Sequence, residues 1–305
     1  MKKVAFFLGK GGVGKTTLSS ATAYNLSRRG RKTLIVSLDP AHNLGDVFGR
    51  KLSNTRSRLA VNLDGMEVDL QEWISRYLKE SREEIQATYR YNTTLNLDSY
   101  LNIMKYTPGT EEYAVLWAIE HVVKEHGAEY DRIVFDTPPT ALTLRFLAMP
   151  TISMIWVREL QEMRERILKK RQTILSLNPE AHVIKGSSRV EDDRIYGKLS
   201  GIQTRLSWLH QLFKENSYLT VIINPDNLSL AEAVRIRHEL EKLDVPIDSV
   251  CFNKAPSDGA CGEEVKQSFH RFPIFTSVYV PEGLRTMDDL IKVEIPELVE
   301  DMERS

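Results

Sequence analysis

A glycine-rich segment that follows a short apolar run constrains the fold of this chain more than any other feature. The apolar run is Val4–Leu8, and the next residues read Gly-Lys-Gly-Gly-Val-Gly-Lys-Thr-Thr. They fit G-x-x-x-x-G-K-[ST], the phosphate-binding loop (P-loop) that joins a strand to a helix. Its glycines let backbone N–H groups surround phosphate oxygens, and the helix dipole favours the same anion. The sequence therefore predicts a nucleotide site at Gly9, Lys10, Gly11, Gly12, Val13, Gly14, Lys15, Thr16 and Thr17.

Three side chains of this loop have distinct predicted roles. Lys15 is expected to reach the β- and γ-phosphates, and the Thr16 hydroxyl is expected to hold Mg²⁺. Lys10 is a second lysine at the start of the loop, and by it the loop resembles the deviant Walker A group. In that group two subunits face each other, and the early lysine of one contacts the phosphates bound by the other. The resemblance implies a homodimer in which Lys10 takes part in catalysis, whereas the alternative is a solvated loop lysine.

Runs rich in Val, Ile and Phe alternate with helical patterns along the chain. This alternation predicts an α/β fold, a P-loop NTPase with a mostly parallel sheet and helices on both faces. Ligands of such sheets bind at the carboxyl ends of the strands, where the P-loop, Asp39, Asp136 and Asn253 are all expected. The predicted strands are Val4–Leu8, Thr33–Leu38, Arg132–Phe135, Leu219–Ile223, Ser249–Phe252 and Ile274–Val280.

Two stretches are too long to be simple crossover connections, and both have helical patterns. We expect residues 1–305 to form a single P-loop ATPase domain with a helical subdomain built from about 72–126 and 151–216. Apolar residues three or four apart form two stripes in the second stretch. These stripes either pack on each other as an ordinary helical core or leave part of the surface open to a partner helix. Their members are Ile152, Ile155, Trp156, Leu160, Met163 and Ile167 in one, and Leu199, Ile202, Leu206, Leu209 and Phe213 in the other.

Two aspartates at predicted strand ends suit phosphoryl transfer to water. This reaction needs a metal ion, a positioned water molecule and stabilisation of charge. Asp136 suits a Walker B role and would reach Mg²⁺ through water. Asp39 is placed to orient or deprotonate the attacking water, although an aspartate before Pro40 is also a common turn residue.

These motifs together resemble the superfamily of arsenical pump-driving ATPases and tail-anchored-protein targeting ATPases. The resemblance extends over nearly the whole chain. It implies that 39–46 is switch I, with Asp39 activating water, and that 136–140 is switch II. It also implies that Asn253 reads the adenine edge and that a loop beginning at Pro281 covers the adenine. Further matching segments are Gly65-Met66-Glu67-Val68-Asp69, Pro108-Gly109, Thr143-Leu144-Arg145-Phe146-Leu147 and Leu228-Ser229-Leu230-Ala231-Glu232.

The chain departs from this superfamily in switch II and in its cysteines. Pro138 stiffens switch II, Ala141 replaces a glycine, and Leu142 replaces a histidine. Cys261 lacks the second cysteine of a Cys-x-x-Cys pair, so two subunits cannot build a four-thiolate zinc site. No cysteine lies between Met1 and Val250, which excludes a thiolate metalloid site in the helical region. We expect neither zinc nor an iron–sulfur cluster, and we expect Cys251 to be a core residue.

Composition limits the partners and the compartment. Lys and Arg number 41 against 42 Asp and Glu, a balance that predicts no nucleic-acid binding. The chain enters its first predicted strand without a signal peptide, and we expect no membrane-spanning segment. Two cysteines fit a reducing compartment. The expected location is the cytoplasm, with peripheral contact to a membrane during delivery of a client.

We predict an Mg²⁺-dependent, homodimeric ATPase, and two functions fit it. In the first, ATP hydrolysis drives the capture and delivery of hydrophobic, tail-anchored membrane proteins, and the ligand is the transmembrane helix of a client. In the second, the chain is the catalytic subunit of an efflux pump for arsenite, antimonite or another anion, with a membrane-embedded partner. A partition ATPase acting on DNA or a membrane surface would need a basic surface or a terminal membrane helix, and the near-neutral charge disfavours it. A non-hydrolysing binding module is disfavoured because the predicted catalytic residues are all present.

Overall fold

The structure is a computed structural model of the 305-residue chain. It describes residues 2–40, 44–88, 107–178, 188–256, 259–280, 286–293 and 295–305, without the side chains of 84–88. Contacts divide the chain into two compact units. The larger unit contains Met1–Phe146 and Lys214–Ser305, and the smaller unit contains Leu147–Phe213. The predicted subdomain boundaries remain a prediction.

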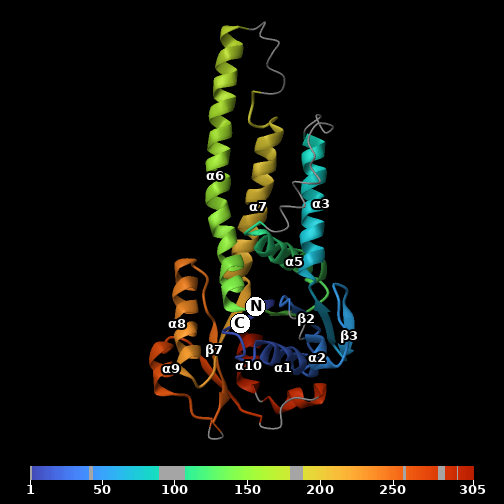
Figure 1. Cartoon of the computed structure of the whole chain (residues 1–305), viewed down its shortest axis with the longest axis vertical. Helices are drawn as coiled ribbons and strands as arrows, with labels where there is room; N and C mark the ends of the chain where they lie inside the picture. The colour runs from blue at the N-terminus through green and yellow to red at the C-terminus, as the bar shows by residue number, and fades with distance from the viewer. Residues whose placement is uncertain are drawn as a thin grey trace. The chain divides into compact units, whose positions relative to one another are not determined.

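The described part of the larger unit contains an eight-stranded sheet with the order β3-β4-β2-β5-β1-β6-β7-β8 (Figure 1). All neighbouring strands are parallel except β3 and β4. This confirms the predicted α/β fold with a mostly parallel sheet. The strands are β1 Val4–Leu8, β2 Thr33–Ser37, β3 Ser57–Ala60, β4 Leu63–Glu67, β5 Arg132–Asp136, β6 Ser217–Ile223, β7 Ser249–Ala255 and β8 Ile274–Val278.

Six of these strands coincide with predicted runs, and the other two, β3 and β4, were not predicted. The residues of β4 include Asp64 and Gly65, which interrupt an apolar run, and β3 is a four-residue edge strand. β4 gains its hydrogen bonds by pairing with β2, and β3 gains its own by pairing with β4, rather than from local preference. Central strands are recognisable in the sequence because both of their faces are buried.

The central strand β1 is apolar throughout because both faces of the sheet are covered. Ala5 and Phe7 lie in a core cluster with Leu18 and Leu26 of α1. On the opposite face Phe6 stacks on Phe135 of β5, with 5.0 Å between ring centroids. A continuous run of five buried residues is the pattern expected for a parallel strand between helical layers.

Helices connect the strands and cover the sheet (Figure 1). α1 begins at Lys15, within the P-loop motif, and packs beside β1, β2 and β5. α3 and α5 of the larger unit pack together, and α8 packs on β6. The helices are α1 Lys15–Arg28, α2 Leu44–Phe48, α3 Leu70–Thr88, α5 Thr110–His126, α6 Thr140–Leu177, α7 Arg194–Glu215, α8 Asn227–Lys242, α9 Glu263–Ser268, the 3-10 helix η1 Met287–Lys292 and α10 Pro296–Arg304.

The smaller unit contains α6 from Leu147 onward and α7 up to Phe213. Polar contacts join these two helices along their length. Gln161 donates to the Gln203 side chain at 3.0 Å, and Arg164 forms a bidentate ion pair with Asp193 at 3.0 and 2.7 Å. Asp193 also accepts from the Tyr196 backbone at the start of α7, so this residue both caps one helix and pairs with the other.

The two apolar stripes of the smaller unit differ in exposure. On α7, Leu206, Leu209 and Phe213 are buried, whereas Leu199 is half-buried and Ile202 is exposed. On α6 every predicted member is exposed, and Trp156 retains 68 % of its accessible surface. The stripes therefore do not bury each other along their whole length within this chain.

Helix α6 also meets a length and composition criterion for a membrane span. It contains an 18-residue window with a mean hydropathy of 1.4, of which 44 % is buried inside the protein. The core helix of a water-soluble protein passes the same criterion.

Candidate functional site

The P-loop joins β1 to α1 at the carboxyl edge of the sheet, as predicted. Gly9 and Gly14 both require positive φ angles, of 156° and 97°. A Cβ atom at Gly9 would lie 2.8 Å from the Ile222 carbonyl oxygen, and one at Gly14 would lie 2.5 Å from the Asn253 amide nitrogen. Glycine is needed at these positions because neither the backbone angle nor the surrounding space accommodates a side chain.

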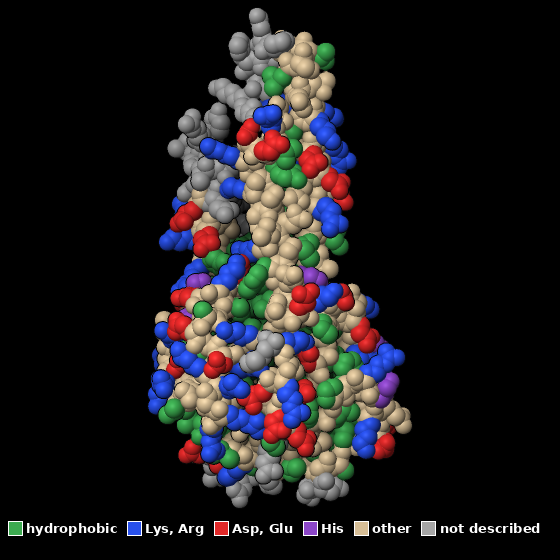
Figure 2. Space-filling view, turned by 180° about the vertical axis from the view of Figure 1, so that it is seen from behind, with side chains coloured by type: hydrophobic (Ala, Val, Ile, Leu, Met, Phe, Trp, Pro, Cys, Tyr) green, Lys and Arg blue, Asp and Glu red, His purple; other side chains and the backbone are tan. Residues whose placement is uncertain are grey.

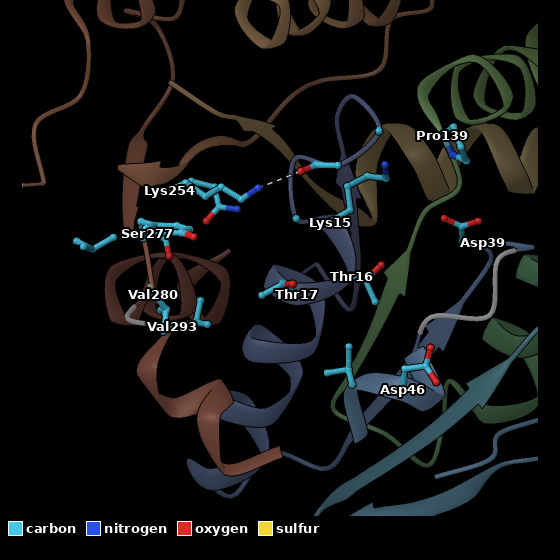
Figure 3. Close-up of a pocket in the computed structure, with 17 residues that line it drawn as sticks. Lys15, Thr16, Thr17, Asp39, Asp46, Pro139, Lys254, Ser277, Val280 and Val293 are labelled. Carbon is cyan, nitrogen blue, oxygen red and sulfur yellow. Dashed lines mark hydrogen bonds between the residues drawn. The ribbon is translucent and has the colours of Figure 1, made fainter. Parts of the chain in front are cut away.

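A pocket of about 620 Å³ opens beside the P-loop (Figure 3). Its lining includes most of the predicted loop residues and Asp39. In Figure 3, Lys15 and Thr16 lie between Asp39 and Asp46 on one side and Lys254 and Ser277 on the other. Further lining residues are Gly11, Gly12, Gly14, Thr17, Val47, Pro139, Asn253, Val278, Tyr279, Val280 and Val293.

The buried ammonium group of Lys15 lies against the loop itself. It donates to the carbonyl oxygens of Gly9 at 3.1 Å and Lys10 at 3.4 Å. Burial lowers its pKa, and the negative charges of Asp136 and Asp39 act in the opposite direction. Lys15 is thus a poorly solvated cation whose charge the two carboxylates favour, and a phosphate oxygen could replace its contacts with the loop carbonyls. The half-exposed Lys10 side chain does not line the pocket.

Asp136 ends β5 and faces Thr16 of the P-loop. The Thr16 hydroxyl donates to its Oδ2 atom at 2.7 Å. Its other oxygen, Oδ1, is buried and accepts no hydrogen bond from the described residues. Burial raises the pKa of Asp136 to about 7, opposed by the Thr16 hydrogen bond and the Lys15 charge.

These residues fit a magnesium ion. A hydroxyl that donates one hydrogen keeps lone pairs for a cation, and the Asp136 Oδ1 atom is a buried acceptor without a donor. The described residues contain no group of three His, Cys, Asp or Glu side chains that could hold a metal ion. Mg²⁺ does not need one, since it commonly binds one or two protein oxygens together with phosphates and water.

Asp39 follows β2 by two residues, and its backbone N–H donates to the Ser37 hydroxyl at 3.3 Å. Its side chain lines the pocket on the side of the predicted switch segments (Figure 3). Residues 41–43 of switch I lie outside the described residues, as does Pro281. The catalytic role of Asp39 and the adenine loop at Pro281 therefore stay predictions.

Two threonines attach switch II to β1 and to the P-loop. Thr137 donates to the Phe7 carbonyl, and Thr140 donates to the Gly9 carbonyl at 3.1 Å. Two of the three switch II departures from the family pattern fall at the start of α6. Ala141 lies in its first turn, where alanine favours helix more than glycine does, and Leu142 is buried.

Asn253 of β7 contacts the P-loop directly. Its amide nitrogen donates to the Val13 carbonyl at 2.7 Å, and its side chain lines the pocket. The following residue, Lys254, has a φ of 55° and donates from Nζ to the Gly12 carbonyl at 3.2 Å. A bulge between Asn253 and Ala255 lets these neighbours act on one loop, although successive strand residues normally point to opposite faces. The adenine contact of Asn253 stays a prediction.

Sequence patterns did not single out Lys254 or Ser277. A left-handed lysine within a strand has no sequence signal, and Ser277 reaches the pocket only through the pairing of β8 with β7. Cys251 is a buried core residue, as predicted, and burial raises its pKa to about 12.

Comparison with known proteins adds an independent observation. The model of a family described as anion-transporting ATPase matches residues 2–296. A protein of Aquifex aeolicus provisionally named arsenical pump-driving ATPase 2 is 32 % identical over 264 residues, which cover 87 % of this chain and 84 % of that protein. ATPase GET3 of Candida glabrata is 30 % identical, with 83 % and 72 % of the two chains covered. ATPase get3 of Schizosaccharomyces japonicus is 30 % identical, with 95 % and 90 % covered.

Proposed function

Because the chain belongs to the anion-transporting ATPase family, we propose that it couples ATP hydrolysis to the capture and delivery of tail-anchored membrane proteins. The chain is an ATPase with the P-loop fold. The observation that carries the proposal is the exposed apolar stripe on α6, in a chain that also has a nucleotide site.

Lys15 and Asp39 would provide the chemistry of hydrolysis, with Thr16 and Asp136 holding Mg²⁺. The bound ion would supply positive charge to the phosphate oxygens. Lys15 would exchange its contacts with Gly9 and Lys10 for phosphate oxygens. Asp39 would orient the attacking water and accept a proton from it as the bond between the γ-phosphorus and the ADP oxygen breaks.

Lys10 would act across a homodimer. Its carbonyl oxygen accepts from Lys15, but its side chain does not line the pocket of its own chain. This supports a role toward a second nucleotide rather than toward the one bound in the same subunit. A dimer would also place two copies of α6 in one assembly.

The stripe on α6 has the dimensions and chemistry of a surface for an apolar helix. Beyond the predicted members, Ile174 and Leu177 of α6 are also exposed, so the exposed apolar residues extend from Ile152 to Leu177 over 25 residue steps, or roughly 37 Å at 1.5 Å per residue. This length is comparable to a hydrophobic membrane span. Apolar residues that recur on one helical face and remain in water mark a site for a partner. Its exposed large apolar residues are Ile152, Ile155, Trp156, Leu160, Met163, Ile167, Ile174 and Leu177.

Charge does not favour the alternative of a DNA-binding partition ATPase. On the face drawn in Figure 2, Lys and Arg side chains of the described residues are interspersed with Asp and Glu, and neither sign forms a continuous patch. The net charge of −1 agrees with this distribution.

The pump function is the second candidate, and the names of several relatives favour it. Activation by a metalloid would require a site other than a cysteine cluster, because the chain has no cysteine before Cys251. Stimulation of ATP hydrolysis by arsenite or antimonite would support this function.

Synthesis of a tail-anchored protein in a cell-free system containing this chain tests the proposal. We expect a complex that is lost when the anchor helix is deleted. Trp156→Asp should weaken the complex at least tenfold without lowering ATP hydrolysis, whereas Arg158→Asp, an exposed change off the stripe, should preserve it. Capture that is equal for both variants, or no capture by the active ATPase, would refute the client proposal.

A further inference from the structure

We propose that the segment from Gly45 to Asn54 links the nucleotide pocket to α3, with Glu67 as the residue that positions it. This rests on the ATPase activity but not on the identity of a client. The segment begins beside Asp46, which lines the pocket, and ends against Trp73 in α3. All of the contacts that carry the link lie within the larger unit.

Glu67 is in β4, the strand that pairs with β2, and Asp39 follows β2 in the chain. It ends β4 and pairs in register with Ser37 of β2, whose hydroxyl accepts from the Asp39 backbone. The Glu67 side chain is 6 % exposed, and its Oε1 atom accepts from the Gly45 N–H at 2.7 Å. A buried carboxylate is costly unless donors satisfy it, so this contact holds the start of α2 in place.

The backbone around Gly45 leaves little freedom for α2 to move alone. A Cβ atom at Gly45 would lie 2.6 Å from the Arg50 carbonyl oxygen and 3.5 Å from Glu67 Oε1. The Arg50 N–H returns to the Gly45 carbonyl at 2.9 Å. The Glu67 N–H donates to the Ser53 carbonyl at 2.9 Å. Glu67 therefore holds this segment near both of its ends, through its side chain at one and its backbone at the other.

Asn54 connects the far end of the segment to α3. Its Oδ1 atom accepts from the Trp73 indole N–H at 2.9 Å and from the Asp69 N–H at 2.9 Å. Asp69 in turn accepts from the backbone of Gln71 at the start of α3. Trp73 is buried and packs edge-to-face against Trp117 of α5, with 5.7 Å between centroids.

If nucleotide binding displaces α2, one of two things must therefore happen. Either Asn54 moves together with α2, or hydrogen bonds to buried groups break. Breaking them is costly, because the Trp73 N–H and the Glu67 carboxylate are shielded from water. In the opposite direction, a ligand that moves α3 would change the position of α2 and thereby hydrolysis.

Glu67→Ala and Glu67→Gln test the positioning of the catalytic segment. We expect kcat to fall roughly tenfold or more in Glu67→Ala, because a charge-assisted hydrogen bond is lost, and less in Glu67→Gln, which keeps an acceptor. The dissociation constant for a fluorescent ATP analogue should change less than about threefold, because Glu67 does not line the pocket. An unchanged kcat in both variants would refute the positioning role, as would equal losses in affinity and kcat.

Trp73 fluorescence tests the link to α3. In a protein with Trp117→Phe, Trp156→Phe and Trp208→Phe, Trp73 is the remaining tryptophan of four. We expect Mg-ATP to change its emission, and Asn54→Ala to reduce that change at least threefold while ATP hydrolysis persists. Thr55→Ala is the matched control, since Thr55 contacts Ser53 in the same segment and is not bonded to Trp73. No response in the parent with nucleotide bound, or an equal response in Asn54→Ala, would overturn the proposal.

Discussion

The nucleotide site and the α6 stripe differ in how their side chains are surrounded. At the nucleotide site, polar and charged groups are buried and contact other parts of the same unit, as Lys15 does with Gly9 and Asn253 with Val13. On α6, large apolar side chains such as Ile155 and Trp156 remain in water. The first region is arranged for a ligand of known chemistry, and the second lacks the surface that would cover it. The residues for nucleotide chemistry are therefore held in place within the chain itself, whereas the role of the stripe depends on a partner that covers it.

Replacing Asp39 should give the largest effect and would test the catalytic side of this comparison. In Asp39→Asn we expect hydrolysis to fall on the order of 10²-fold or more, because the amide cannot accept the proton of the attacking water. ATP affinity should remain within a few-fold. Steady-state kinetics with a separate binding measurement would check this. Normal turnover in the variant would remove Asp39 from the reaction.

Gly14→Ala should show how closely the P-loop is packed. The new methyl group would lie within 2.5 Å of the Asn253 amide nitrogen, at a φ of 97° that alanine rarely adopts. We expect at least a tenfold loss of ATP affinity, since strain of about 1–2 kcal/mol adds to the steric conflict. Titration with a fluorescent nucleotide would measure it. Unchanged affinity would show that Asn253 can move away without cost.

The ion pair between Arg164 and Asp193 should control local stability in the smaller unit. We expect Arg164→Ala to destabilise the α6–α7 contact by about 1–3 kcal/mol, because both charged hydrogen bonds are lost. Hydrogen exchange of the first turns of α7 would report the change. Asp193→Asn is a useful comparison, since it keeps a cap for α7 but removes the charge.

The same pair predicts a pH dependence. Hydrogen bonding from Arg164 holds the pKa of Asp193 below its ordinary value. The contribution of the pair is therefore fully present above the pKa of the unfolded state, about 4, and is lost as the pH falls through the lowered value. Hydrogen exchange of α7 would be measured in the parent protein and in Asp193→Asn as the pH is lowered. If low pH opens α7 no more in the parent than in Asp193→Asn, the predicted direction of the pH dependence is wrong.

Gly197→Ala in α7 should give the smallest effect and is the counterpart of Gly14→Ala. A Cβ atom at Gly197 meets nothing within 4 Å. We expect stabilisation of up to about 1 kcal/mol, because alanine favours helix more than glycine does. Thermal unfolding would measure it. Destabilisation would show that a partner surface approaches α7 closely at this position.

Much of the site could be predicted because its chemistry is concentrated in short segments. The P-loop pattern identified Lys15 and Thr16, and strand ends identified Asp39 and Asp136. Lys254 could not be predicted, because its contact with Gly12 depends on a bulge and a left-handed backbone. Glu67 belonged to a matching segment, but its contact with Gly45 depends on the pairing of β4 with β2.

The sequence by itself determined the fold class, the P-loop and the order of strand and helix in the central sheet. These features arise from local patterns, namely buried apolar runs, glycines with required backbone angles and helical periodicity. Only the tertiary structure decided which residues of the apolar stripes are covered. Leu206 and Trp156 follow the same helical spacing, but one is buried and the other is exposed. The spacing of apolar residues indicates that they share one face of a helix. Whether that face is buried depends on the surface that lies opposite it.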